Sequence, residues 1–175
     1  MAGMTEDVRF TSTRGPELAG ALEAPEVGQR GWGLFVHGFT LRTASWVLVR
    51  NELRARWGDA VRMIFPDCRG HGDSGGCTAE QSTVALLGDD IATVLRALVP
   101  EGPVVLVGHS MGGMAICGFA TGYPELIGTR VVGASLLLYA WRAPAVGLGQ
   151  RFAGGDQCEL DEAIHLALVL GRNHR

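Results

Sequence analysis

The chain of 175 residues contains no lysine, so all 15 of its permanently basic side chains are arginines. This absence excludes a P-loop lysine, a Schiff-base lysine and a serine–lysine catalytic pair. Charged residues of any kind make up only 19% of the chain, the formal net charge is −3, and the arginines form no basic block. We therefore expect no nucleic-acid partner and no polybasic membrane anchor, which leaves small molecules as the expected partners.

The sequence also leads us to expect no export signal and no membrane span. Residues 1–10 include acidic side chains where a signal peptide would carry basic and then apolar residues. The most apolar run, residues 131–141, is far shorter than the ~20 residues of a membrane-spanning helix. We therefore expect a cytoplasmic protein with no membrane span. In that reducing compartment we expect the four scattered cysteines to be unpaired: Cys68, Cys77, Cys117 and Cys158.

Apolar runs alternate with helical segments along most of the chain. Residues 8–12 and 18–23 are extended runs around a turn that contains Gly15 and Pro16, which predicts an antiparallel hairpin. Further buried strands are predicted at residues 33–36, 61–65, 103–107 and 131–139. Helices are predicted at residues 46–57 with Ser45 as the N-cap, at residues 84–98, and from residue 111 to about residue 123.

This order of elements predicts an α/β fold. We expect a mostly parallel sheet that is flanked by helices on both faces and preceded by an N-terminal antiparallel hairpin. Residues 1–142 are assigned to this core, and residues 143–175 to a partial lid or a C-terminal helical segment. Within that segment, residues 159–170 have the spacing of an amphipathic helix, and the alternative is a short helix followed by a strand at residues 166–170.

A G-x-S-x-G pattern occurs at residues 108–112, Gly108-His109-Ser110-Met111-Gly112. It lies directly after the predicted strand 103–107 and directly before a helical segment, which is the strand–turn–helix context of a nucleophile elbow. Such a turn pushes the serine hydroxyl out of the sheet and brings the backbones on either side of it together, so side chains at positions 108 and 112 would clash. The pattern therefore predicts Ser110 as a catalytic nucleophile.

Two further loops complete a family resemblance. His37-Gly38-Phe39 follows the third predicted strand, and Asp67-Cys68-Arg69-Gly70-His71-Gly72-Asp73-Ser74 follows the fourth. Together with the serine motif, over roughly residues 8–139, they resemble the landmarks of the α/β-hydrolase family. The resemblance implies a serine esterase or lipase-like enzyme with a small-molecule ester substrate, no metal and no organic cofactor. A serine at position 110, where haloalkane dehalogenases and epoxide hydrolases of this fold carry aspartate, disfavours those two chemistries.

Acyl transfer needs hydrogen-bond donors aimed at the developing oxyanion. We expect the backbone N–H groups of Phe39 and Met111 to supply them, and the helix that begins at Met111 to add its positive dipole end. The ring of Phe39 is expected to line the acyl pocket. The alternative interpretation of Phe39 is a core residue at a strand end.

The acid and the general base follow the serine in the chain order of this family, and only His165 and His174 lie downstream of Ser110. Residues 166–174 resemble the family's last strand followed by its catalytic histidine, which would pair His174 with Asp156. Against this, few residues separate Asp156 from the strand, and a crossover normally needs a dozen or more. The favoured prediction is a chain truncated after the sixth strand, within the lid region, with His165 as a surface or interface residue.

Other polar residues near these loops are expected to be structural. His37, His71 and His109 precede or adjoin Ser110, where the resemblance implies roles in loop structure or the pocket wall. The glycine-rich residues 70–76 do not form a P-loop, because the motif's lysine is missing. Asp67, His71 and Asp73 could ligate a metal in principle, but turn-forming and capping roles are expected, so no metal site is predicted.

Two functions are consistent with this sequence. The first is a serine hydrolase that acts on carboxylic esters through an acyl-enzyme on Ser110. The alternative is a truncated, non-catalytic α/β-hydrolase-like protein that binds ligands or a partner, including a second copy of itself, through an exposed sheet edge. Chemistry that depends on Ser110 separates the two.

Overall fold

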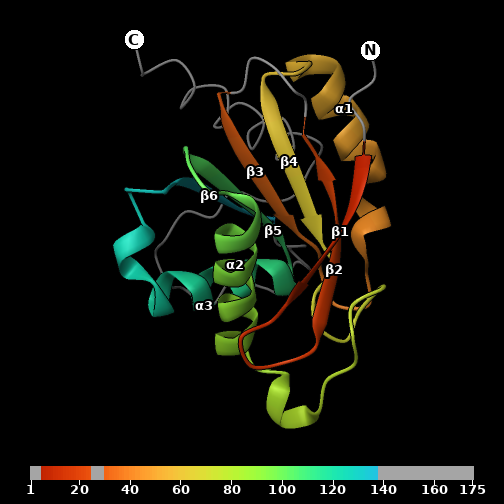
Figure 1. Cartoon of the computed structure of the whole chain (residues 1–175), viewed down its shortest axis with the longest axis vertical. Helices are drawn as coiled ribbons and strands as arrows, with labels where there is room; N and C mark the ends of the chain where they lie inside the picture. Colours follow the sequence, from red (N-terminus) through yellow and green to blue (C-terminus); the bar gives the residue numbers. More distant parts are fainter. Residues whose placement is uncertain (1–4, 25–29, 138–175) are drawn as a thin grey trace, which may run out of the picture.

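A six-stranded sheet organises the computed structural model, which describes residues 5–24 and 30–137 (Figure 1). The strands are β1 (Thr5–Thr11), β2 (Glu17–Glu23), β3 (Gly31–Val36), β4 (Val61–Pro66), β5 (Val104–His109) and β6 (Val131–Leu137). The α-helices are α1 (Val47–Trp57), α2 (Val84–Leu98) and α3 (Met111–Gly122). The 3₁₀ helices are η1 (Thr43–Trp46), η2 (Ala79–Gln81) and η3 (Pro124–Leu126).

The strand order is β1-β2-β4-β3-β5-β6, and it confirms the predicted fold class. β1 and β2 form the antiparallel hairpin, and β2 also runs antiparallel to β4. β4, β3, β5 and β6 are parallel to one another, so their carboxyl ends meet at one edge of the sheet. That edge is where ligands bind in open α/β sheets.

Helices cover both faces of the sheet, with α1 on one face and α2 and α3 on the other (Figure 1). β3 is an apolar run because it is buried on both faces. Leu34 and Val36 pack in the core beneath α2 and α3, whereas Phe35 packs on the opposite face with Trp46 and Leu53 of the η1–α1 segment. The alternation of strand side chains between two covered faces accounts for the continuous apolar sequence.

The start of the first helix differs from the prediction. Trp46, and not Ser45, is the N-cap of α1, because a turn of 3₁₀ helix, η1, precedes it. The Ser45 hydroxyl instead accepts a hydrogen bond from the Arg42 N–H at 3.3 Å and so caps η1. The stripe that was predicted from the apolar spacing is confirmed, since Trp46 and Leu53 are buried and Val49 and Trp57 pack beside them.

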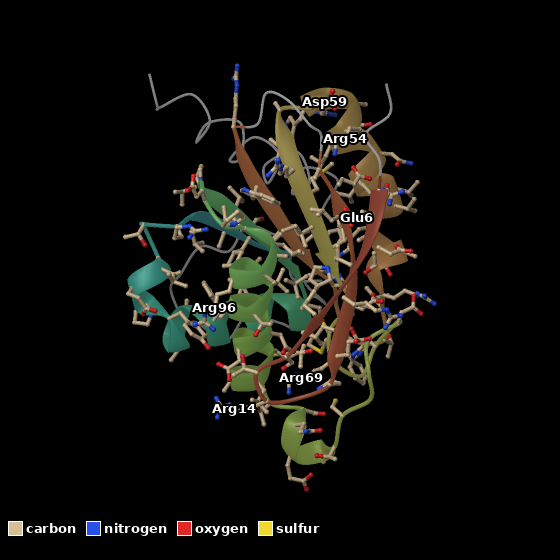
Figure 2. The ribbon with its side chains drawn as sticks, viewed as in Figure 1. Glu6, Arg14, Arg54, Asp59, Arg69 and Arg96 are labelled. Atoms are coloured by element: carbon tan, nitrogen blue, oxygen red, sulfur yellow. The ribbon has the colours of Figure 1, made fainter. Side chains whose placement is uncertain are left out.

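An ionic cluster attaches α1 to the sheet. The Glu23 carboxylate at the end of β2 is buried, and it accepts hydrogen bonds from Arg54 Nε and Nη2 at 3.2 and 2.8 Å. Arg50, one helical turn earlier, places its Nε 3.2 Å from the same carboxylate. Figure 2 shows Arg54 on α1, close to the sheet. Two arginines thus compensate one buried acid, which would otherwise be costly to take out of water.

The other face depends on backbone contact between α2 and α3. A Cβ on Gly88 of α2 would lie 2.6 Å from the carbonyl carbon of Gly118 and would collide with the Phe119 nitrogen. A Cβ on Gly118 of α3 would in turn collide with the Val84 carbonyl oxygen. Only glycine at both positions allows the two helices to approach so closely.

Among the described residues, β1 and β6 form the two edges of the sheet. The exposed side chains of β1 include Glu6, Asp7 and Arg9, and charges of this kind oppose the pairing of an edge with another strand. Self-association through an edge stays a prediction. Within residues 5–24 and 30–137, the helices are all too short or too polar to cross a membrane.

Gly88→Ala should destabilise the protein, because the new methyl group would meet the main chain of α3 rather than a movable side chain. We expect the free energy of unfolding to fall by about 1–3 kcal/mol, as for other overpacked cores. Urea denaturation measures the change. Gly122→Ala at the end of α3 is the matched control, because a Cβ there meets nothing within 4 Å and stability should stay constant or rise by up to ~1 kcal/mol. Equal losses in the two variants would contradict this account.

Candidate active site

Ser110 forms the turn between β5 and α3, as the G-x-S-x-G motif predicts. Its backbone has φ 51° and ψ −110°, and its N–H donates to the Leu137 carbonyl of β6 at 2.8 Å. Its own carbonyl accepts hydrogen bonds from the N–H groups of Gly113 at 2.9 Å and Met114 at 3.3 Å. A serine with positive φ is strained, by about 1–3 kcal/mol in comparable cases, and it is held here by α3 on one side and β6 on the other.

The two glycines of the motif have the close contacts that the sequence predicts. A Cβ on Gly108 would lie 2.6 Å from the carbonyl carbon and oxygen of Gly112. A Cβ on Gly112 would collide with the Val36 carbonyl oxygen at the end of β3. The first turn of α3 is therefore in contact with the main chain of both β5 and β3.

The loop after β3 lies beside this turn. β3 and β5 pair in parallel with Val36 opposite Gly108, so the residues that follow each strand are neighbours. A Cβ on Gly38 would be 2.7 Å from His109 Nδ1, which shows how tightly the loop fits against the elbow. The structure therefore places Phe39, Ser110 and Met111 at the same edge of the sheet.

Phe39 is 68% exposed, so the alternative interpretation as a core phenylalanine is wrong. Its ring contacts the His71 ring edge-on, with centroids 5.5 Å apart and an interplanar angle of 75°. His71 comes from the loop after β4, and its Nδ1–H donates to the Arg69 carbonyl at 2.9 Å. Two loops that are far apart in the sequence thus meet through these rings, beside the serine turn.

His37 has no exposed surface, and both of its ring nitrogens have partners. Nδ1 is 2.8 Å from the Gly38 carbonyl oxygen, which can only accept, so Nδ1 carries the proton. Nε2 accepts a hydrogen bond from the Cys68 N–H at 2.9 Å. Burial lowers the pKa of His37, which favours the neutral ring. This bonding matches the structural role expected for His37.

Asp67 organises the loop after β4, as its predicted capping role implies. Its Oδ1 accepts a hydrogen bond from the Thr43 N–H at 2.6 Å and its Oδ2 accepts one from the Asp73 N–H at 2.8 Å. Gly72 lies so close that a Cβ there would collide with this carboxylate. Asp73 itself faces outward and forms an exposed ion pair with Arg42. Within the described part of the chain, His, Cys, Asp and Glu side chains form no group suited to hold a metal ion.

Sequence reasoning missed the buried ion pair beneath this loop. Arg69 donates from Nε and Nη2 to the two carboxylate oxygens of Asp90, at 2.7 Å each, and both side chains are nearly inaccessible. Arg69 also donates to the Ser12 hydroxyl and the Gln81 carbonyl. Arg69, labelled in Figure 2, therefore connects the hairpin turn, the glycine-rich loop and α2. The sequence signal that could have revealed this pair is Asp90, an acidic residue beside the apolar stripe of α2, because a buried carboxylate needs a partner.

The described cysteines, Cys68, Cys77 and Cys117, are unpaired, as expected. Cys68 lies beside His37, and burial raises the pKa of its thiol to about 12. A thiol with so high a pKa is a poor nucleophile, which agrees with a structural role for Cys68.

The remaining candidates lie outside the described residues. They are Asp156, His165, His174 and Cys158, together with the proposed lid segment 143–175. Residues 138 and 139 of the last predicted strand also lie outside, whereas the strand predicted at 103–107 extends to His109 because His109 still pairs with Leu137 of β6.

Ser110→Gly should be more stable than Ser110→Ala, because glycine adopts positive φ without a steric cost whereas alanine keeps a Cβ. We expect the free energies of unfolding to differ by about 1 kcal/mol, the released strain less the larger backbone entropy of glycine. Ser82, where φ is −101°, provides the control pair, and there the alanine variant should be the more stable. Urea denaturation of the four variants measures both differences, and a Ser110→Ala variant at least as stable as Ser110→Gly would argue against strain.

Asp90→Ala should lower the free energy of unfolding by about 3–5 kcal/mol, because it leaves the Arg69 guanidinium buried without its carboxylate. Asp73→Ala removes an exposed ion pair with Arg42 from the same loop and should cost less than about 1 kcal/mol. Guanidinium denaturation, monitored by circular dichroism, compares the two variants. Similar small losses would show that the Arg69–Asp90 pair contributes little.

Comparisons with known proteins agree with this geometry. Residues 34–171 match the alpha/beta hydrolase family. A 2-(acetamidomethylene)succinate hydrolase of Mesorhizobium japonicum is 33% identical over 153 residues, which are 86% of this chain and 52% of that protein. A monoacylglycerol lipase of Mycolicibacterium smegmatis is 25% identical over 119 residues, 66% of this chain and 41% of the lipase.

The solved structures agree as well. The esterase RhEst1 from Rhodococcus sp. ECU1013 aligns with a TM-score of 0.61 and 26% identity, over 78% of this chain and 45% of the esterase. This chain spans about half the length, or somewhat less, of these relatives. The family match extends over most of the chain and includes the serine turn and both neighbouring loops. The chain belongs to the α/β-hydrolase family.

Proposed function

We propose that this protein is a serine hydrolase that acts on carboxylic esters of small molecules through an acyl-enzyme on Ser110. The observation that carries the proposal is the backbone of Ser110, which is held at φ 51° between the end of β5 and the start of α3. A strained conformation of this kind persists only where its surroundings enforce it, and such positions are concentrated at active sites. At the carboxyl edge of a parallel sheet, this turn is the place for a nucleophile.

In the proposed reaction the Ser110 hydroxyl attacks the ester carbonyl carbon as a general base takes its proton. The tetrahedral intermediate collapses, the ester C–O bond breaks, and the alcohol leaves with a proton. Water then attacks the acyl-enzyme, which releases the carboxylic acid and restores the serine. The base and the acid are not assigned: His174 and Asp156 are the candidates of the less favoured prediction, and both lie outside the described residues. His37 is unsuited as the base, because its Nε2 already accepts the Cys68 N–H and its Nδ1 faces a carbonyl.

The oxyanion hole of this proposal consists of two backbone amides. Met111 is the first residue of α3, so its N–H has no acceptor within the helix, and the helix dipole favours negative charge there. Phe39 is the second donor, and its loop lies against the elbow through Gly38. Both donors belong to the main chain, so they are oriented before the substrate binds.

The ester class is supported by the relatives. Those described above are a 2-(acetamidomethylene)succinate hydrolase, a monoacylglycerol lipase and an esterase, so the family members that this chain resembles include enzymes named for ester cleavage. The exposed ring of Phe39, on the loop that lies against the serine turn, supports an apolar acyl group, because such a group would cover the ring when it binds. If the following experiment contradicts the proposal, its result favours the alternative function, a non-catalytic binding protein.

A fluorescent fluorophosphonate, which reacts with activated serines, tests the proposal. The unmodified protein and Ser82→Ala should be labelled equally, since Ser82 is exposed and makes only local hydrogen bonds. Ser110→Ala should reduce labelling by at least about 100-fold, because loss of a catalytic serine costs several orders of magnitude in rate. Circular dichroism confirms that each variant is folded. Labelling that is absent, or that persists in Ser110→Ala, would overturn the proposal.

A further inference from the structure

The proposed oxyanion donor, the Phe39 N–H, must point in one direction, yet the residue before it is a glycine, Gly38. Phe39 N–H belongs to the peptide unit between Gly38 and Phe39, and a glycine lets the adjoining peptide plane rotate more freely than any other residue does. The next residue, Thr40, has a φ of 64°, so the chain turns sharply directly after this unit. A peptide unit in such a loop needs external hydrogen bonds to keep one orientation.

Those hydrogen bonds come from two donors on the Gly38 carbonyl. His37 Nδ1–H is 2.8 Å from this oxygen, and the Leu41 N–H is 3.2 Å from it. In a planar trans peptide the C=O and N–H groups point in opposite directions. Fixing the Gly38 carbonyl therefore fixes the direction of the Phe39 N–H on the other side of the same plane.

The His37 imidazole is itself held by the loop that follows another strand, β4. Its Nε2 accepts a hydrogen bond from the N–H of Cys68, the second residue after β4, at 2.9 Å. The ring is fully buried, so water does not compete for either nitrogen. The two bonds require one tautomer, with the proton on Nδ1 and none on Nε2, and the opposite tautomer would lose both of them.

We infer that His37 is a positioning residue, which holds the Gly38–Phe39 peptide unit so that the Phe39 N–H faces the Ser110 turn. This inference rests on the proposed function, since it concerns the oxyanion donor of that reaction. His37 touches no reacting atom. Its ring links the loop after β4 to the loop after β3. It thereby fixes the orientation of the Phe39 N–H, which Gly38 alone would leave free to rotate.

Two substitutions separate this role from simple packing. His37→Asn places an amide N–H donor near the Nδ1 position and keeps the bond to the Gly38 carbonyl. His37→Gln places its polar atoms near the Nε2 position and keeps the contact with Cys68 but not the one with Gly38. Each variant loses one hydrogen bond and retains the other, so they are a matched pair.

The kinetic measurement is turnover of a p-nitrophenyl ester. We expect His37→Gln to lower kcat by about 10- to 100-fold with little change in KM, because oxyanion contacts strengthen only in the transition state. His37→Asn should stay within about threefold of the unmodified protein, although both variants lose similar thermal stability. Equal kcat losses in the two variants, or a loss expressed mainly in KM, would reduce His37 to a packing residue and overturn the inference.

The second measurement needs no activity. Long-range ¹H–¹⁵N NMR of the unmodified protein should show His37 protonated at Nδ1 and bare at Nε2, and the Phe39 amide signal should move in His37→Gln but not in His37→Asn. A bare Nδ1, or an unmoved Phe39 signal, would overturn the inference whatever the activity. If Ser110 is not labelled by the fluorophosphonate but the NMR results are as expected, the proposed function fails while His37 is still shown to hold the peptide unit.

Discussion

The contact between the first turn of α3 and the end of β3 determines the geometry of the candidate site. Gly112 lies so close to the Val36 carbonyl that no side chain fits between them, and Gly108 approaches Gly112 in the same way. Because these are main-chain contacts, the serine turn and the loop after β3 keep a fixed relative position that does not depend on side-chain conformers. The strained backbone of Ser110 lies in the turn that brings α3 into this contact.

Around this contact, several buried polar groups are joined by hydrogen bonds and an ion pair. His37 joins the loop after β3 to the end of β4, and Asp67 joins the end of β4 to η1 and to its own loop. Beneath them, the Arg69–Asp90 pair joins that loop to α2. Buried polar groups with complete hydrogen bonding are rigid, because every alternative arrangement leaves a donor or an acceptor unsatisfied in a medium of low polarity. The loops at the sheet edge are therefore ordered by polar bonds, and the sheet beneath them by apolar packing.

The sequence was sufficient to predict the elements that depend on local patterns. The apolar runs and their spacings located the six strands and the three α-helices, and Gly108 and Gly112 around Ser110 predicted the elbow because that turn needs glycine on both sides. What could not be predicted is set by partners that are distant in the chain. β5 continues to His109 because β6 pairs with it, and Ser45 lost its expected role because a 3₁₀ turn forms before α1.

The same limit applies to the side chains of the site. His37 was predicted to be structural, but its partner Cys68 is brought to the ring by the parallel pairing of β3 with β4 and could not be read from the sequence around His37. Arg69 and Asp90 are 21 residues apart, and neither reveals the other until α2 packs on the sheet. Gly88 and Gly118 are unfavourable residues for a helix interior, which hints at a close contact, but neither helix alone reveals which element makes that contact.

The two faces of the sheet consequently differ in how they accommodate a change of sequence. Where α2 meets α3 at Gly88 and Gly118, the fit is between backbones, so a substitution on one helix has no compensating substitution on the other. Where α1 meets β2, long arginine side chains span the gap to Glu23, and they can follow small displacements of the helix. In this protein α1 can therefore accommodate small shifts across the sheet, whereas α2, α3 and the serine turn attached to α3 are held in one arrangement.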